Sequence, residues 1–416
     1  MSESALPSRS AYPWYLTSSS LWMAGMSLQG FLFTWLLVGI LDRPADEAGF
    51  ARSLAEFPPL LVLLLGGVLG DRFNGRSYLG VMHVLMALPP LVLMFVYTQG
   101  WMGYWWVVLF GVAMASIQAL SDPARQSMLS RVARMDLQRA VTLMMVITSL
   151  VGLGGVYLGG RLEVLGLPIV LAGQAGFFLA GLFAVYLLPS LPQHQPDRAT
   201  RSRPNLAAGF KAVWGAALIR NMIGLNFLSS LFNAGAYIIA IPYIATEVYQ
   251  GDAGFLATVI IVFTTGSIAS NVLLLVFMPL KHPGRLFLVL QLSRMLILGI
   301  LLLQPSLWLF YVVMVAWGLN MGVTTTLVRT TVQELATEAY RAQILSVLLL
   351  SFVVSSPISS VLLGLLIAET SPLAALVPGI GISLVIFLIG VARSGLWTYR
   401  SPSVHLAQDP AHQPTS

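Results

Sequence analysis

The side chains best suited to charge chemistry fall in two short segments between apolar runs. Residues 66–76, GGVLGDRFNGR, end one apolar run, and the next run begins directly after them. Asp71, Arg72 and Arg76 are too polar for an apolar surrounding, so we expect a short loop here, preceded by small residues that let another helix approach closely. The second segment is 122–126, DPARQ. Charges beside helix ends can hold a partly dry contact together by ion pairing and by capping.

No catalytic or metal-binding signature accompanies these segments. The five histidines are scattered, and no Gly-x-x-x-x-Gly-Lys-Ser/Thr loop occurs. The chain has no cysteine, which excludes disulfides, thiolate metal sites and a cysteine nucleophile. We therefore expect neither an enzyme nor a bound cofactor or metal.

Composition places the chain in a membrane. It is 57% hydrophobic and 9% charged, with a mean hydropathy of +0.83, whereas a soluble domain is about 25% charged. The apolar runs are about 20 residues long, which predicts spanning helices rather than barrel strands. The net charge of +6 comes from arginines between the runs and does not predict nucleic-acid binding. The first residues lack a signal-peptide layout, so we expect the first run to remain as a span.

The runs predict an all-α protein with twelve spans in two sets of six. A proline-rich, basic linker is expected at 189–204 and a short helix lying in the membrane interface at 205–220. The predicted parts are a six-helix half at 1–188, the linker with its interfacial helix at 189–220, a second half at 221–400 and a disordered tail at 401–416. The expected spans are 17–41, 52–70, 77–97, 103–121, 140–160, 167–188, 221–246, 254–278, 286–303, 307–327, 343–367 and 373–397.

The basic residues lie almost entirely on one side of these spans. Of the 22 lysines and arginines, 18 lie on one side. Arg43, Arg52 and Arg161 lie on the other side, and Arg294 lies inside a span. By the positive-inside rule this puts both termini and the linker in the cytoplasm, and it requires an even number of spans.

The two sets of spans echo each other. The segment 281–285, KHPGR, follows the eighth span as 71–76 follows the second, and 327–330 closes the tenth span as 123–126 closes the fourth. Duplicated six-span units are how many transporters are built, with the substrate site near the bilayer midplane. The repeat therefore indicates transport, driven by a gradient rather than by ATP bound to this chain.

The 66–76 segment resembles the loop motif of the major facilitator superfamily, Gly-x-x-x-Asp-Arg-x-Gly-Arg-Arg. Asn74 and Gly75 depart from that motif, and its other positions are filled by Gly67, Asp71, Arg72 and Arg76. The pattern with Asn at 74, together with Pro-Ala-Arg-Gln at 123–126, is similar to the branch that includes siderophore and drug exporters, such as enterobactin exporters.

This resemblance implies two pseudo-symmetric six-helix halves around a central cavity and a charged gate at the cytoplasmic side. The gate residues it implies are Asp71, Arg72, Arg76, Asp122 and Arg125. For 122–126 another interpretation stays open, in which a helix starts here with Pro123 in its first turn and Asp122 as its cap.

The fifth span ends GLGGVYLGG at 152–160, which resembles the antiporter signature Gly-Pro-x-x-Gly-Gly of drug exporters. Gly155, Gly159 and Gly160 match, and Val156 stands where proline is expected. The open alternative is a close-packed span without a coupling role.

Ionisable residues inside spans are rare and often functional. Glu56 precedes Pro58 and Pro59, where a kink is expected, and we predict that it takes and releases the coupling proton. The alternative is an ion pair with Arg52, four residues earlier on the same face. We expect Arg294 to have a structural or snorkelling role, and His83 to snorkel or pack.

A substrate cavity with aromatic walls and a few amides would suit a bulky amphipathic solute. The candidates are Gln29, Trp35, Gln118, Asn226, Asn233, Trp317 and Asn320. For each of them, helix–helix hydrogen bonding or lipid contact is the alternative. We expect a monomeric exporter of a siderophore or drug-like compound in the bacterial inner membrane, working by proton antiport. The open alternatives are an importer or facilitator of a nutrient and a non-transporting scaffold.

Overall fold

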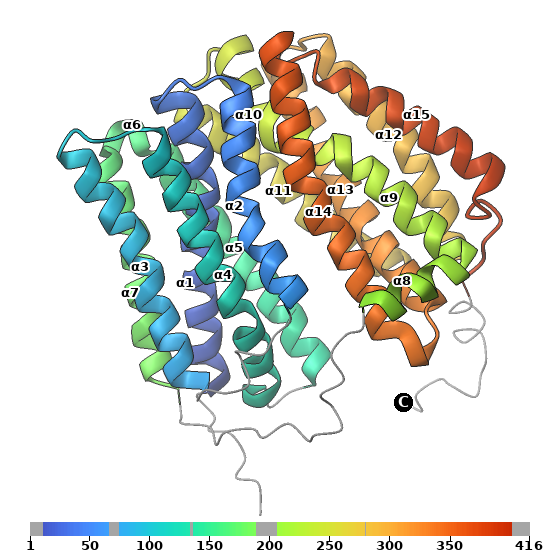
Figure 1. The fold of residues 1–416 in the computed structure, drawn as a ribbon, viewed down its shortest axis with the longest axis horizontal. Helices are drawn as coiled ribbons and strands as arrows, with labels where there is room; N and C mark the ends of the chain where they lie inside the picture. The colour runs from blue at the N-terminus through green and yellow to red at the C-terminus, as the bar shows by residue number, and fades with distance from the viewer. Residues whose placement is uncertain (1–10, 66–74, 134–135, 189–205, 279, 402–416) are drawn as a thin grey trace, which may run out of the picture. The chain divides into compact units, whose positions relative to one another are not determined.

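The computed structural model describes residues 11–65, 75–133, 136–188, 206–278 and 280–401. Within these ranges the regular structure is helical (Figure 1). The chain separates into two compact units. Unit 1 comprises 1–201 with 249–261, and unit 2 comprises 202–248 with 262–416.

Unit 1 is built on pairs of long helices (Figure 1). The first helix, α1, packs on α5 and α7, α3 packs on α7 and α4, and α2 packs on α4. The π-helical turn η1 extends α1, and the single turn α6 lies between α5 and α7. The bounds are α1 Ala11–Trp35, η1 Leu36–Ile40, α2 Ala45–Leu65, α3 Gly75–Thr98, α4 Tyr104–Val132, α5 Leu137–Gly160, α6 Leu162–Leu165 and α7 Leu167–Tyr186.

Unit 2 repeats this pairing. The pair α9 and α14 corresponds to α1 and α5, and the pair α12 and α15 corresponds to α3 and α7. Likewise, α9 packs on α15 as α1 packs on α7, and α12 packs on α13 as α3 packs on α4. The fold is therefore two pseudo-symmetric halves, as predicted. The bounds are α8 Leu206–Gly215, α9 Ala217–Gly235, η3 Ala236–Ala240, α10 Ile241–Tyr243, η4 Ile244–Val248, α11 Ala253–Phe277, α12 Pro283–Leu302, α13 Leu307–Leu335, η5 Glu338–Tyr340, α14 Arg341–Glu369 and α15 Leu376–Arg393.

The connections repeat as well. In each half the first long helix ends in a π turn, η1 or η4, and the second residue after it has a left-handed backbone: Asp42 at φ 45° and Gln250 at φ 51°. Two residues after α3 and after α12 the same happens at Gly100, φ 72°, and Gln304, φ 51°. A left-handed backbone is costly for residues other than glycine, so its recurrence at matching places reflects the shared course of the halves.

Eleven helices in the described ranges are long and apolar enough to cross a membrane. The twelfth long helix, α2, holds the place of the second span but carries Asp46, Glu47, Arg52 and Glu56, and the residues after Leu65 lie outside the described ranges. Helices α4 and α13 continue to Val132 and Leu335, beyond the ends expected for the fourth and tenth spans at 121 and 327.

Glycines allow close helix contacts in both units. Gly155 of α5 lies so close to the carbonyl group of Ala24 in α1 that a side chain there would collide with backbone. In unit 2, Gly318 of α13 meets the carbonyl of Phe263 in α11 in the same way. The close-packed character predicted for the fifth span is therefore present, since backbone-to-backbone contact needs small residues.

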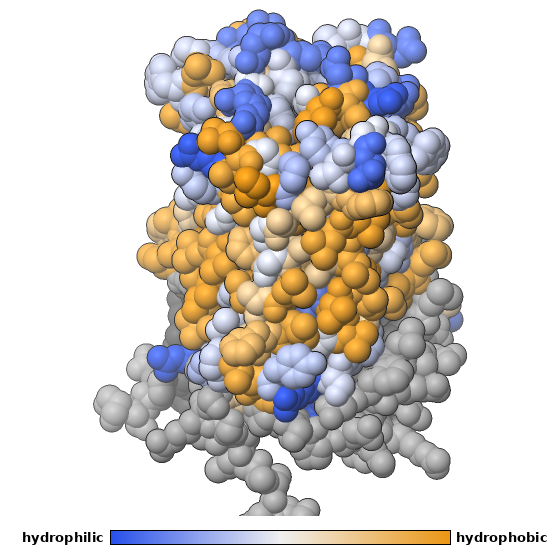
Figure 2. Space-filling model, turned by 90° about the vertical axis from the view of Figure 1, so that its left-hand side faces the viewer, coloured by the Kyte–Doolittle hydropathy of each residue, from blue (hydrophilic) through white to orange (hydrophobic). Residues whose placement is uncertain are grey.

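The face of unit 1 formed by α3 and α7 exposes apolar side chains, as a surface in contact with lipid does. Figure 2 shows hydrophobic residues across the middle of the face that carries α3 and α7. Exposed side chains there include Phe95 at 55%, Ile169 at 58% and Phe183 at 64%. In unit 2 the short helix α8 also exposes apolar side chains, with Trp214 at 72%, while Val213 is buried. That α8 lies in the membrane interface stays a prediction.

The last described residues are held against α13. Ser401 Oγ donates to Glu334 Oε2 at 2.9 Å, and the Tyr399 hydroxyl donates to the same oxygen at 3.4 Å. Burial and the neighbouring carboxylate raise the pKa of Tyr399 to about 12. Ser401 is thus bonded to α13, while 402–416 lie outside the described residues, and the disordered tail stays a prediction.

Candidate functional site

A chain of hydrogen bonds joins α1 and α4 inside unit 1. Trp22 of α1 donates its indole N–H to Gln118 Oε1 at 2.6 Å, and Gln118 Nε2 donates to Asp122 Oδ1 at 2.6 Å. Gln118 and Asp122 are one helical turn apart on α4, so their side chains meet on one face. The bonds fix the orientation of the amide, because its oxygen must face the indole and its nitrogen the carboxylate.

Arg125 lies over the face of the same indole. Its guanidinium carbon lies 4.5 Å from the centroid of the Trp22 ring, and the residue is only 9% exposed. A cation this close to an indole face is stabilised by the ring quadrupole, the more so when it is desolvated. The Tyr15 hydroxyl donates to the Arg125 carbonyl oxygen at 2.6 Å, which ties α1 to α4 a second time.

His83 of α3 extends the network to α7. It is fully buried, with Nδ1 at 2.9 Å from the Phe178 carbonyl oxygen and Nε2 at 2.9 Å from Ser18 Oγ. A carbonyl can only accept, so Nδ1 carries a proton, and in the neutral ring Nε2 accepts from the Ser18 hydroxyl. The imidazole meets Trp22 edge-on with centroids 4.9 Å apart, and it rests on Gly181, where a side chain would collide with the ring. Of the two roles predicted for His83, packing is confirmed and snorkelling is wrong.

The gate predicted from the loop motif falls partly outside the described residues. Asp71 and Arg72 lie in the undescribed stretch 66–74. Arg76, in the first turn of α3, donates from Nη2 to the Tyr186 carbonyl oxygen at 2.5 Å, and its guanidinium carbon lies 6.0 Å from the centroid of the Tyr186 ring. This carbonyl ends α7, where the helix dipole favours a cation.

The other two predicted gate residues, Asp122 and Arg125, lie together within α4 and share the Trp22 network. The alternative of a helix start at this point is wrong, because Pro123 lies inside α4, which runs from Tyr104 to Val132. Prolines are tolerated within spanning helices when neighbouring groups satisfy the freed backbone. That these residues close a gate stays a prediction.

Glu56 forms the ion pair with Arg52 that was the alternative to a role in proton coupling. Arg52 Nε donates to Glu56 Oε1 at 2.7 Å across one turn of α2, and the two side chains are 27% and 19% exposed. The remaining oxygen of Glu56 has no partner among the described residues. The ion pair gives Glu56 a partner within its own helix, and its role as the coupling group stays a prediction.

Unit 2 encloses a second polar network, centred on Arg294 of α12. The residue is 4% exposed, and its side chain donates to Asn320 Oδ1 from Nε at 3.0 Å and from Nη2 at 2.7 Å. Nη1 donates to Ser229 Oγ at 2.6 Å, and Nη2 also reaches Thr324 Oγ1 at 3.3 Å. Every partner is neutral, so the charge is held by oriented dipoles. The structural role predicted for Arg294 is present, and snorkelling is wrong because the side chain is buried.

Other amides surround this arginine. Ser229 Oγ donates to Gln291 Oε1 at 3.2 Å, and Asn233 Nδ2 donates to the Ser229 carbonyl at 2.8 Å. Asn226 Nδ2, Asn233 Oδ1 and Gln291 Nε2 are buried without a partner among the described residues. Buried amide groups of this kind need explaining, since an unsatisfied polar atom costs about 1–3 kcal/mol.

The residues predicted to line a substrate cavity divide between the units. Gln29 and Trp35 of α1 are 9% and 5% exposed, and Trp35 stacks on Phe31. Trp317 is 1% exposed and meets Phe263 edge-on. Gln118 belongs to the Trp22 network, and Asn233 and Asn320 belong to the Arg294 network. Their role toward a substrate stays a prediction.

Sequence reasoning missed the residues that complete both networks: Tyr15, Ser18 and Trp22 in unit 1, and Ser229, Gln291 and Thr324 in unit 2. One signal could have been found earlier. Gln118 and Asp122 are spaced i, i+4, which predicts an amide–carboxylate bond on a helix.

The fold and these networks together define a class. Duplicated six-helix units of apolar spans, each with buried polar side chains among its helices, are the architecture of secondary membrane transporters. In the described ranges no group of three or more acidic or histidine side chains is placed to hold a metal ion.

Comparison with family models gives the family. Residues 16–360 match the model of the Major Facilitator Superfamily, and the chain belongs to this family. It is a multi-pass membrane transporter, not an enzyme. A search of curated proteins found no match.

Solved structures share the fold at low identity. The nucleoside transporter NupG matches with a TM-score of 0.71 and 13% identity over 94% of this chain and 98% of that chain. A D-xylose-proton symporter matches with a TM-score of 0.68 and 13% identity over 92% and 97%. A bacterial homologue of the human lysosomal transporter Spinster matches with a TM-score of 0.62 and 13% identity over 94% and 97%. At this identity the likeness concerns the fold alone.

Proposed function

We propose that this chain exports a small amphipathic molecule, a siderophore or drug-like compound, across a bacterial inner membrane by proton antiport with alternating access. In this proposal the chain acts as a monomer with both termini in the cytoplasm. The loop motif at 66–76 and the segment 123–126 support export through their resemblance to exporter sequences. The arginine distribution supports the orientation.

Proton coupling rests on one observation, the setting of Asp122. Its Oδ1 is held by a neutral amide, Gln118 Nε2 at 2.6 Å, inside α4 and one turn from Arg125. A carboxylate bonded to an amide can take up or release a proton without breaking an ion pair, whereas Glu56 would have to leave Arg52. Acidic residues in spans commonly serve as proton relays. Asp122 therefore takes precedence over Glu56 as the proton carrier.

The proposed substrate class is supported by the hydrogen bonds that buried Arg294 already makes. Arg294 is engaged by Asn320, Ser229 and Thr324 of its own unit. It is thus not presented as the deep arginine clamp that a phosphate or nitrate needs. Aromatic and amide side chains, such as Trp317 and Asn226, favour an amphipathic or aromatic solute.

Inside-out vesicles with a respiration-driven proton gradient test this proposal. Candidate compounds are added outside, and a fluorescent pH probe reports protons leaving the lumen. We expect substrate-driven proton release with the wild type and with Glu56→Gln, and none with Asp122→Asn. Asp136→Asn is the matched control, because Asp136 is exposed beyond the end of α4. Proton release that survives in Asp122→Asn, or that is lost in Glu56→Gln, would contradict the role given to Asp122.

Import by proton symport is the second candidate function. It is favoured by the fold likeness to a D-xylose-proton symporter and a nucleoside transporter. Right-side-out vesicles distinguish the two. A symporter makes the external medium more alkaline when its substrate is added outside, while an antiporter oriented for export does not.

A further inference from the structure

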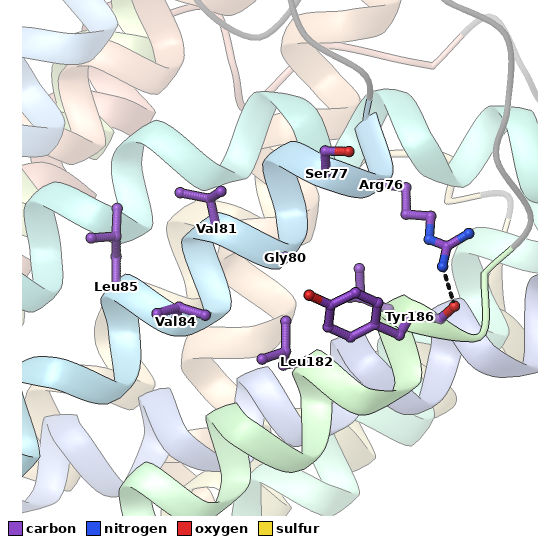
Figure 3. Close-up of a pocket in the computed structure, with 9 residues that line it drawn as sticks. Arg76, Ser77, Gly80, Val81, Val84, Leu85, Leu182 and Tyr186 are labelled. Atoms are coloured by element: carbon purple, nitrogen blue, oxygen red, sulfur yellow. Dashed lines mark hydrogen bonds between the residues drawn. The ribbon is translucent and has the colours of Figure 1, made fainter.

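A surface groove lies between α3 and α7 of unit 1 (Figure 3). It is near the end of the unit where α3 begins and α7 ends. Its volume is about 370 Å³, within the range of ligand clefts. Figure 3 shows the guanidinium of Arg76 and the ring of Tyr186 at one end, and Val84 and Leu85 toward the other. The lining residues are Arg76, Ser77, Gly80, Val81, Val84, Leu85, Leu182, Val185 and Tyr186.

Gly80 helps to keep the groove open. A Cβ atom added there would meet only Leu182 Cδ1, at 3.5 Å, which is ordinary contact. The walls beside it are apolar and exposed, with Val81 at 53% and Val84 at 43%. Because α3 is long and apolar enough to cross a membrane, the groove on its surface opens where lipid chains surround the protein.

The end of the groove is positively charged. Arg76 is fixed there by its bond to the Tyr186 carbonyl and by its contact with the Tyr186 ring. Arg131 of α4 lies near the start of α3, since its Nη1 would lie 3.8 Å from a Cβ atom added at Gly75, but it does not line the groove. The guanidinium of Arg76 thus supplies the positive charge at the end of an apolar groove.

We propose that this groove binds one anionic phospholipid, with the phosphate at Arg76 and an acyl chain along Gly80, Val84 and Leu182. Basic pockets between spanning helices on the cytoplasmic side favour anionic head groups, and an apolar groove open to the bilayer favours a chain. A soluble anion would use the charge but not the groove, and a zwitterionic lipid would use the groove but not the net charge. A positive charge at the end of an apolar groove therefore favours a molecule that has both an anionic head group and an acyl chain. This inference does not depend on which solute the transporter carries.

Native mass spectrometry of the full chain, released from detergent with added lipid, tests the proposal. The probes are phosphatidylglycerol and phosphatidylcholine with the same acyl chains. The wild type should retain phosphatidylglycerol in preference. Arg76→Gln should weaken that binding about fivefold, the effect of one charge near the surface, and should leave phosphatidylcholine unchanged.

Gly80→Leu should weaken the binding of both lipids, because the new side chain fills the groove. Gly176→Leu is the matched control. It places the same side chain on an exposed face of α7, where a Cβ atom meets nothing within 4 Å and which does not line the groove. Unfolding temperatures of all variants are recorded to show that they are folded.

Equal lipid binding by Gly80→Leu and Gly176→Leu would overturn the proposal. Phosphatidylglycerol binding by Arg76→Gln as strong as that of the wild type would do the same. Inorganic phosphate should not displace the bound lipid, and displacement by it would assign the site to a soluble anion instead.

Discussion

Replacing Arg294 should reveal what holds the polar network of unit 2 together. Two variants are compared, Arg294→Met, which removes the charge at similar length, and Arg294→Lys, which keeps it. The wild-type guanidinium reaches Asn320 and Ser229 from different nitrogens of one rigid fork. A lysine ammonium has its donors on a single atom and cannot reproduce that geometry.

The expected order is counter to the usual view of conservative substitution. In Arg294→Met, Asn320 Oδ1 loses both of its donors, which costs about 1–3 kcal/mol for one buried unpaired acceptor. The Ser229 hydroxyl retains Gln291 as its partner. In Arg294→Lys the charge stays buried with part of its hydrogen bonding lost, and an uncompensated buried charge costs about 3–5 kcal/mol. The lysine variant should therefore be the less stable.

Thermal unfolding of the purified full chain in detergent, followed by tryptophan fluorescence, measures the difference. The centres of the two ranges differ by about 2 kcal/mol, and one kcal/mol shifts the Tm of a unit of this size by about 2–4 °C, so we expect a Tm difference of about 4–8 °C. Arg285→Lys is the matched control, because Arg285 lies exposed on the same helix. A lysine variant at least as stable as the methionine variant would refute the reasoning, since charge rather than fork geometry would then hold the cluster.

Three further experiments test the packing, the Trp22 network and the repeated turns. Gly155→Leu should lower stability by about 1–3 kcal/mol or more, through collision with backbone of α1. Gly154→Leu, next to it but facing open space, should stay within about 0.5 kcal/mol of the wild type in the same unfolding assay. Gln118→Leu should cost about 1–3 kcal/mol by leaving the Trp22 N–H and the partner carboxylate unpaired. Adding Trp22→Phe should then cost less than it does alone, and additive losses would contradict the network. Gln304→Gly should raise stability by about 0.5–1 kcal/mol, because φ there is 51° and glycine adopts it without strain. An unchanged or lower Tm would count against strain at that turn.

The fold was largely predictable because lipid imposes simple rules on sequence. Long apolar runs predicted the spans, and eleven of the described helices are long and apolar enough to cross a membrane. The even number of spans inferred from arginine placement stays a prediction. The ends were less predictable where polar residues continue a helix beyond the hydrocarbon. Pro123 shows why: it reads equally well as a first-turn residue and as an interior residue that spanning helices tolerate.

The buried networks could not be predicted because their partners are far apart in the chain. Trp22 and Gln118 are separated by 96 positions, and Arg294 and Ser229 by 65. Any amide or hydroxyl on a neighbouring helix could have served, and only the packing of the helices selects among them. The local pairs, Arg52 with Glu56 and Gln118 with Asp122, follow from helical spacing alone.

The π turns η1 and η4 have a mechanical consequence. Each terminates the long opening helix of its half, and in η1 the amide of Leu41 bonds to the carbonyl of Leu36, 2.9 Å away, five positions back. An amide in such a widened coil can exchange that carbonyl for the adjacent one by a slight twist. The end of each opening helix can therefore rotate while its amides exchange one carbonyl acceptor for the next. An ordinary α-helical end would have to lose those hydrogen bonds to rotate in the same way.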